Sequence, residues 1–193
     1  IGAIAKGSGM IHPNMATMLA FVTSDVAISK DMLNEVIHEV VADTFNMVSV
    51  DGDTSTNDML TLMCNGLVKN PEITQKDEHY QIFKEALMSI CTCLSRGIAK
   101  DGEGATKLLT CQVHHAQTKK DAKVVAKTII TSSLFKAAMF GEDANWGRIL
   151  CAIGYSPAEF DINKIKVDLA SQEGTICVCQ NGRGYPFDED KAS

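Results

Sequence analysis

The order of apolar and polar residues predicts both strands and helices in this chain. Apolar residues dominate positions 17–23 and 59–64, so each stretch is predicted to be a strand, the first of them buried. Ser29 is a suitable helix N-cap, and apolar residues follow it at spacings of three, four and seven. Residues 30–46 are therefore predicted to form an amphipathic helix, and a second helical stripe runs over 82–94.

The second half of the chain is also predicted to contain both helices and strands. Asp121 is predicted to start a third helix, and residues 145–153 a short fourth one. Residues 165–169 and 175–179 predict a hairpin, because a polar turn that ends in glycine separates the two stretches.

Two further stretches complete the expected fold. Residues 108–114 alternate in part and are predicted to be β-like, whereas the glycine-containing residues 1–15 are predicted to be irregular. The elements lack the regular strand–helix repeat of a doubly wound sheet, which favours a layered α/β sandwich.

Composition narrows the class of protein. The chain has 193 residues, of which 45% are apolar and 22% charged, and a net charge of −6 without any block of like charges. This pattern excludes an evident nucleic-acid or membrane-surface partner. No apolar run approaches the roughly 18–20 residues that span a bilayer. Seven cysteines, an odd number in no zinc or redox spacing, indicate reduced thiols in the cytoplasm, and no histidine motif for a metal is present.

Three short polar segments that contain glycine stand out between the predicted core elements. They are the first segment (residues 6–17), the second segment (residues 50–58) and the third segment (residues 100–107). Each is a candidate for chemistry, because loops that a rigid scaffold positions carry most functional side chains.

Thr17 ends the first segment and begins a predicted strand. Its hydroxyl has no histidine at a spacing that marks a base, but a threonine whose own α-amine is freed can use that amine as the base. The residues alone leave two interpretations open: a threonine that packs in a strand, or an N-terminal nucleophile.

Carboxylates dominate the other two segments. Asp51, Asp53 and Asp58 superficially resemble a calcium loop, but the glycine and glutamate that an EF-hand requires are missing, so a hydrogen-bonded structural loop is the favoured interpretation. Glu103 stands between two glycines. It suits a cationic substrate group better than a phosphate, and a solvated turn is the alternative.

Four strings identify a family resemblance. The chain is similar to the ornithine acetyltransferases, the glutamate N-acetyltransferases of arginine biosynthesis, in KGSGMIHPNMATMLAFVTSD, TFNMVSVDGDTSTND, DGEGATK and LFKAAMFGEDANWGRILCAIGY. The resemblance implies a layered α-β-β-α sandwich of the self-processing N-terminal-nucleophile type. It extends from Ile1 to about Tyr185 and corresponds to the central and C-terminal part of the family's longer chains.

The resemblance also assigns residues. Cleavage is expected between Ala16 and Thr17, so residues 1–16 would end the α chain and residues 17–193 would form most of the β chain, as one domain. Thr17 would be the catalytic nucleophile and also contact substrate. Lys6 and Glu103 would bind substrate, and Asn57 and Asp58 would support the site.

The implied reaction moves the acetyl group of N2-acetylornithine to glutamate through an acetyl-threonine, with no cofactor. Whether acetyl-CoA serves as a second donor stays open. The expected assembly is a heterotetramer of two α and two β chains. The family's oxyanion hole would lie before Ile1, and its C-terminal substrate residues beyond Ser193, so the 193-residue piece alone is expected to be inactive.

Two other classes remain as alternatives. One is a self-processing aminopeptidase or amidohydrolase of related fold, in which water resolves the acyl-enzyme. The other is a scaffold or binding protein that keeps the fold without the chemistry. The substrate motifs around Lys6 and Glu103 favour the acetyltransferase, and the presence of Thr17 disfavours a scaffold.

Overall fold

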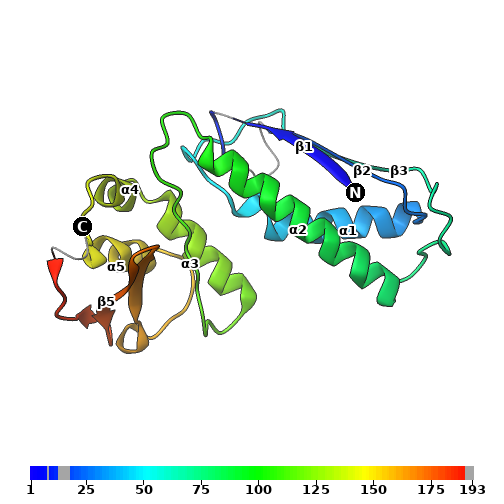
Figure 1. Cartoon of the computed structure of the whole chain (residues 1–193). Helices are drawn as coiled ribbons and strands as arrows, with labels where there is room; N and C mark the ends of the chain where they lie inside the picture. The colour runs from blue at the N-terminus through cyan, green and yellow to red at the C-terminus, as the bar shows by residue number, and fades with distance from the viewer. Residues whose placement is uncertain (8, 13–17, 190–193) are drawn as a thin grey trace. The chain divides into compact units, whose positions relative to one another are not determined.

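The computed structural model describes residues 1–7, 9–12 and 18–189. The chain divides into two compact units, Ile1–Leu108 and Leu109–Ser193, which we call unit 1 and unit 2 (Figure 1). Each unit has a hydrophobic cluster of its own, and together their helices and sheets make an α/β fold.

Unit 1 combines a sheet of three strands with two long helices. Its described elements are β1 (Gly2–Lys6), β2 (Leu19–Ser24), α1 (Lys30–Asp43), the 3-10 turn η1 (Phe45–Met47), β3 (Met59–Cys64) and α2 (Glu78–Lys100). In the sheet β2 is central, antiparallel to β1 and parallel to β3. Leu19 lies opposite Lys6 on one side and Met59 on the other.

The strand β1 corrects the expectation that residues 1–15 are irregular. Five residues of this stretch pair with β2 in register, from Gly2 opposite Thr23 to Lys6 opposite Leu19. Ala3 and Ala5 pack against the core of unit 1, while the residues between them face outward. The inward-facing residues of this stretch, Ala3 and Ala5, are too small to give a clear apolar alternation in the sequence. The segment forms a strand because it pairs with β2.

The helices α1 and α2 lie on the same side of the sheet, where they cover its inner face (Figure 1). The helix α1 begins directly after the predicted cap Ser29, whereas α2 begins before the predicted stripe at 82–94, after a cap, Asp77, that was not predicted. The Ser29 hydroxyl accepts the N–H of Met32 at 3.4 Å, and the Asp77 carboxylate accepts the N–H of Tyr80 at 3.1 Å. The core between sheet and helices is built from strand and helix side chains, including Ala20, Val22, Leu62, Val36, Val40, Tyr80, Phe83, Leu87 and Cys91.

The outer face of the same sheet exposes large apolar side chains. Ile4 is 70% exposed, and Met63, Leu19 and Met59 are each at least 40% exposed. Phe21 lies between Ile4 and Thr61 in the register of the same face. The strand predicted as buried at 17–23 is therefore buried on one face only, and we call this outer surface the open sheet face.

Unit 2 packs three helices with a small antiparallel sheet. Its described elements are α3 (Lys119–Thr131), α4 (Ser133–Phe140), α5 (Trp146–Gly154), the 3-10 turn η2 (Ile162–Lys164), β4 (Val167–Ser171), β5 (Gly174–Gln180) and β6 (Arg183–Gly184). The predicted hairpin is confirmed as β4 and β5, and the predicted fourth helix as α5. The third helix begins two residues before Asp121, because Thr118 caps it and accepts the Asp121 N–H at 3.1 Å.

The predicted strand at 108–114 is wrong. These residues form no strand in the structure, although Leu109 and Cys111 pack against the core of unit 2. Partial alternation there reflects side chains that reach the core from an irregular segment. None of the helices in the described part of the chain is long and apolar enough to cross a membrane.

Candidate functional site

The three polar segments meet in unit 1 beside the ends of the strands. The first segment begins with Lys6 at the end of β1, the second directly precedes β3, and the third begins at the last residue of α2. Ala16 and Thr17, the expected cleavage site and nucleophile, lie outside the described residues. Met18, the next described residue, is 4% exposed and directly precedes β2.

Asp51 fastens the second segment to the first. Its carboxylate accepts the backbone N–H of Met10 at 2.6 Å and that of Ile11 at 3.0 Å. It also accepts the N–H of Asp53 at 2.9 Å within its own loop. Burial raises the pKa of Asp51, but these backbone donors outweigh that effect and hold the pKa below its usual value.

Three further hydrogen bonds join the first segment to the second segment and to Ser49 beside it. The N–H of Val50 donates to the Ile11 carbonyl at 2.6 Å, and the Thr54 hydroxyl donates to the His12 carbonyl at 3.0 Å. Nδ1 of His12 lies 3.0 Å from the Ser49 hydroxyl. The backbone that leads toward the expected cleavage site is therefore held at three successive residues, 10 to 12.

Met10 marks a sharp change of direction in this backbone. Its φ of 57° lies in the left-handed region, which costs a non-glycine residue energy. The bonds from Asp51 to Met10 and Ile11 stabilise that conformation. This role of Asp51 was not predicted from the sequence, where the one local signal is an aspartate followed by glycine, which favours an Asx turn.

The third segment reaches the first through Glu103. A Cβ placed on Gly9 would lie 2.8 Å from Oε2 of Glu103, so the carboxylate rests against the Gly9 backbone. A Cβ on Gly102 would lie 2.8 Å from a methyl group of Val50. Glycine at both positions therefore lets the third segment approach the other two closely.

Lys6 and Glu103 thus belong to neighbouring segments. Lys6 ends β1, opposite Leu19, and is exposed. Glu103 is also exposed. Two opposite charges beside an accessible strand end suit a ligand that carries both a carboxylate and an ammonium group.

Asn57 and Asp58 differ in their surroundings. Asn57 is exposed, and its backbone N–H donates to the Ser55 hydroxyl at 3.2 Å. Both carboxylate oxygens of Asp58 are buried and accept no hydrogen bond of normal geometry from the described residues. Burial raises the pKa of Asp58, and the nearby N–H of Met18 lowers it by less.

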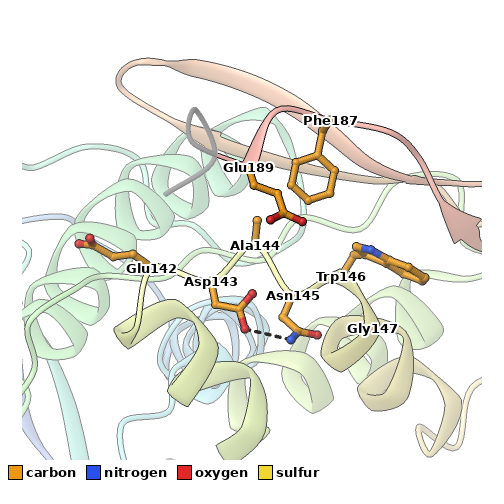
Figure 2. Close-up of a pocket in the computed structure, with 8 residues that line it drawn as sticks. All are labelled: Glu142, Asp143, Ala144, Asn145, Trp146, Gly147, Phe187 and Glu189. Atoms are coloured by element: carbon orange, nitrogen blue, oxygen red, sulfur yellow. Dashed lines mark hydrogen bonds between the residues drawn. The ribbon is translucent and has the colours of Figure 1, made fainter.

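A separate cavity of about 420 Å³ lies in unit 2 (Figure 2). The loop between α4 and α5 and the C-terminal segment line it, through Glu142, Asp143, Ala144, Asn145, Trp146, Gly147, Phe187 and Glu189. Asn145 caps α5 by accepting the Arg148 N–H at 3.2 Å, and its amide donates to Asp143 at 2.9 Å. The hydrogen-bonded Asp143 and Asn145 in Figure 2 therefore have a structural role at the start of α5.

The described residues contain no group of three or more histidine, cysteine, aspartate or glutamate side chains placed to hold a metal ion. In the second segment, the carboxylate of Asp51 is occupied by backbone donors. The calcium-loop likeness of this segment thus corresponds to a hydrogen-bonded loop.

Known proteins similar to this chain share both its sequence and its fold. The arginine biosynthesis bifunctional protein ArgJ 1 of Clostridium acetobutylicum is 53% identical over 192 residues, which are 100% of this chain and 47% of that protein. ArgJ of Bacillus subtilis is 48% identical over 192 residues. The chain therefore spans about half the length of the curated relatives it matches.

A solved structure supports the same relationship. The crystal structure of the arginine biosynthesis bifunctional protein ArgJ from Bacillus halodurans superimposes with a TM-score of 0.82 and 41% sequence identity. The superposition covers 89% of this chain and 79% of that one. Residues 1–193 match the ArgJ family throughout, and the chain belongs to that family.

Proposed function

We propose that the protein to which this chain belongs transfers the acetyl group of N2-acetylornithine to glutamate in arginine biosynthesis. The observation that carries the proposal is the convergence of the described parts of the three motif segments, in which Asp51 accepts the N–H groups of Met10 and Ile11 and Glu103 lies against Gly9. An independent support is that the relatives are named arginine biosynthesis proteins.

The proposed maturation is self-cleavage between Ala16 and Thr17. The Thr17 hydroxyl attacks the Ala16 carbonyl carbon, the peptide C–N bond breaks, and the ester so formed is hydrolysed. The products are the Ala16 carboxylate and a free Thr17 α-amine. The bonds from Asp51 to the backbone of Met10 and Ile11 favour this step, because they restrict the approach to the scissile bond.

The proposed transfer is a double displacement. The Thr17 amine accepts the hydroxyl proton as Oγ attacks the acetyl carbonyl, and ornithine leaves after its nitrogen regains a proton. Glutamate then attacks the acetyl ester through its amine and releases Thr17. Lys6 is proposed to bind the α-carboxylate common to both amino acids, and Glu103 an ammonium group. These steps need no cofactor.

The names of the relatives favour a second donor. They are called bifunctional, and acetyl-CoA is an acetyl donor that would acylate the same Thr17 hydroxyl and let glutamate be acetylated directly. We propose this as the second activity, in an assembly of two α and two β chains that acts in the cytoplasm.

One comparison of variants tests the proposal. The full-length protein and its Thr17→Ala variant are followed by chain size and assayed for acetyl exchange between acetylornithine and glutamate. We expect two chains and turnover for the wild type, and one inactive chain for the variant. Thr17→Ser should retain both cleavage and transfer at reduced rate, because it keeps the hydroxyl. A wild type that stays intact, or an alanine variant that turns over, contradicts the proposal.

A further inference from the structure

The sequence contains two asparagine–glycine pairs, Asn65–Gly66 and Asn181–Gly182, and the structure holds them differently. Such a pair can react without a catalyst, because the glycine nitrogen can attack Cγ of the asparagine side chain and close a five-membered ring. A glycine has no side chain that obstructs this ring. The reaction requires a backbone nitrogen that can give up its proton, so the hydrogen bond of each glycine N–H determines how readily its pair reacts.

Asn65 directly follows β3, at the end of the sheet opposite to the three polar segments. It is exposed, and its Oδ1 accepts the N–H of Leu67 at 3.0 Å. This bond closes an Asx turn, which folds the side chain back toward the Gly66 peptide. Among the described residues, no acceptor is bonded to the Gly66 N–H. The side chain and the nitrogen that it would react with are therefore both available.

The loop around this pair leaves room for the ring to form. A Cβ on Gly66 would meet its nearest neighbour at 3.7 Å, an ordinary van der Waals distance. The loop is held at its ends, where the N–H of Asn65 donates to the Ser24 carbonyl at 3.1 Å and that of Val68 to the Asp25 carbonyl at 3.0 Å. Val68 is itself 55% exposed, so water reaches the peptide between these two anchors.

The second pair is held by its surroundings. Asn181 and Gly182 connect β5 to β6 with φ angles of 53° and 69°, as in a type I′ hairpin turn. The N–H of Gly182 donates to the Ile165 carbonyl at 3.0 Å. A Cβ on Gly182 would collide with the carbonyl oxygen of Ile162, so this backbone is packed against η2. Ring closure at Asn181 therefore requires the hairpin to open first.

We propose that Asn65 is a site of spontaneous deamidation in the folded protein and that the fold protects Asn181. The Gly66 nitrogen gives its proton to a solvent base and bonds to Cγ of Asn65, while the side-chain nitrogen takes up a proton and leaves as ammonia. Water then adds to one of the two ring carbonyl carbons that flank the Gly66 nitrogen, and the C–N bond to that carbon breaks. The net reaction consumes one water and releases one ammonia, with no oxidation or reduction.

The two possible ring openings give different products. Breaking the bond to Cγ leaves an aspartate, whereas breaking the bond to the backbone carbonyl carbon leaves an isoaspartate. Either product adds a negative charge to this loop, and isoaspartate also lengthens the backbone by one methylene group. The anchors at Ser24 and Asp25 cannot both keep their present register with a longer backbone between them. Because this end of the sheet is remote from the three polar segments, the inference does not depend on the proposed function.

The test compares the two pairs within one molecule. The full-length protein is incubated in its native state in water enriched in oxygen-18, and the peptides that contain each pair are quantified by mass spectrometry. An asparagine that converts during the incubation carries one heavy oxygen, which separates it from earlier conversion. We expect Asn65 to convert at least about tenfold faster than Asn181, since Gly182 must first be released by local opening. In denaturant the two rates should approach each other, because both pairs then present the same unhindered glycine.

A variant isolates the reacting side chain. Asn65→Gln would need a larger ring, so conversion at this position should stop while the rate at Asn181 stays unchanged. Isoaspartyl methyltransferase, which labels isoaspartate alone, gives a second measure on the same samples and should label the Asn65 peptide of the native wild type.

The outcomes separate clearly. Equal rates at the two pairs in the native protein overturn the inference, and so does faster conversion at Asn181. A tenfold difference that persists in denaturant also overturns it, because sequence rather than fold would then be the cause. If Asn65→Gln does not fold, the comparison within the wild type still decides. A protein without acetyl transfer would refute the proposed function and leave this inference standing.

Discussion

The carboxylate of Asp51 accepts the backbone N–H of Ile11 at 3.0 Å, across 40 positions of sequence. The same carboxylate accepts the N–H of Met10, whose backbone is in the left-handed region. One side chain thus stabilises the turn that begins the approach to the expected cleavage bond. The loop before β3 and the segment after β1 therefore act as one structural element.

Replacing Asp51 should weaken this element. Asp51→Ala removes a charged acceptor from three backbone donors, so the free energy of unfolding should fall by about 1–3 kcal/mol. Self-cleavage should slow, because residues 10 and 11 lose their anchor. Denaturant unfolding and the time course of chain size measure the two effects. Asp53→Ala, in the same loop and exposed, is the control and should change stability by less than about 0.5 kcal/mol.

The contribution of Asp51 should also depend on pH in a defined direction. Its pKa in the folded protein lies below that of the unfolded chain, so its stabilisation is fully present above the unfolded value, which is about 3.9 for aspartate. It is lost as the pH falls through the folded pKa. The difference in unfolding free energy between wild type and Asp51→Ala should therefore shrink from pH 6 toward pH 2. A difference that grows over this range would contradict the assignment.

Gly9→Ala tests the contact between the first and third segments. The new Cβ would lie 2.8 Å from the Glu103 carboxylate, which is the end of a flexible side chain and can move away. We expect KM for acetylornithine to rise while kcat changes less, since the displaced group is proposed to bind substrate. Steady-state kinetics of the full-length enzyme provide the measurement.

A matched glycine gives the control for that variant. Gly97 lies inside α2, and a Cβ there meets nothing within 4 Å. Gly97→Ala should stabilise the helix by up to about 1 kcal/mol and leave both kinetic parameters unchanged. Similar kinetic effects at both positions would mean that Gly9 does not act through Glu103.

Lys6 should matter for both amino-acid substrates. Lys6→Met keeps much of the stem but removes the cation, and KM for acetylornithine and for glutamate should rise about tenfold or more, which corresponds to the loss of roughly 1.4 kcal/mol in each complex. Lys30→Met, at the start of α1, should leave both values unaltered. A rise for one substrate alone would show that Lys6 does not bind the group that both share.

Two neighbouring thiols should react very differently. Burial raises the pKa of Cys91 to about 11, and this residue is 1% exposed. Cys93 follows two positions later in α2 and is exposed. At pH 8, iodoacetamide should modify Cys93 within minutes and Cys91 only after unfolding, because the thiolate is the reactive form. Peptide mapping after alkylation distinguishes the two, and equal labelling of the native protein would refute the packing of α2.

Local signals explain which parts of this fold were predictable. α1 and α2 follow from a capping side chain and an apolar stripe, both of which a short window of sequence contains. β1 does not, because Ala3 and Ala5 are small and only the pairing with β2 makes the segment a strand.

Some residues of the candidate site were likewise predictable from local sequence, and others were not. Lys6 and Glu103 came from motif strings, and their segments prove to be neighbours through Gly9. The hydrogen bond between Asp51 and Ile11 joins positions 40 residues apart, and the burial of Asp58 depends on the register of β2 and β3. Neither property exists before the chain has folded, so no local pattern reveals it.

The antiparallel pairing of β1 with β2 determines what scission would do to the molecule. Ala16 and Thr17 fall between these strands in sequence, so each cleavage product would keep one of them. Cleavage would remove the covalent connection between the two strands but leave the backbone hydrogen bonds of their antiparallel pairing. The two products would therefore stay associated through one shared sheet. The two polypeptides should therefore copurify in native buffer and separate in denaturant.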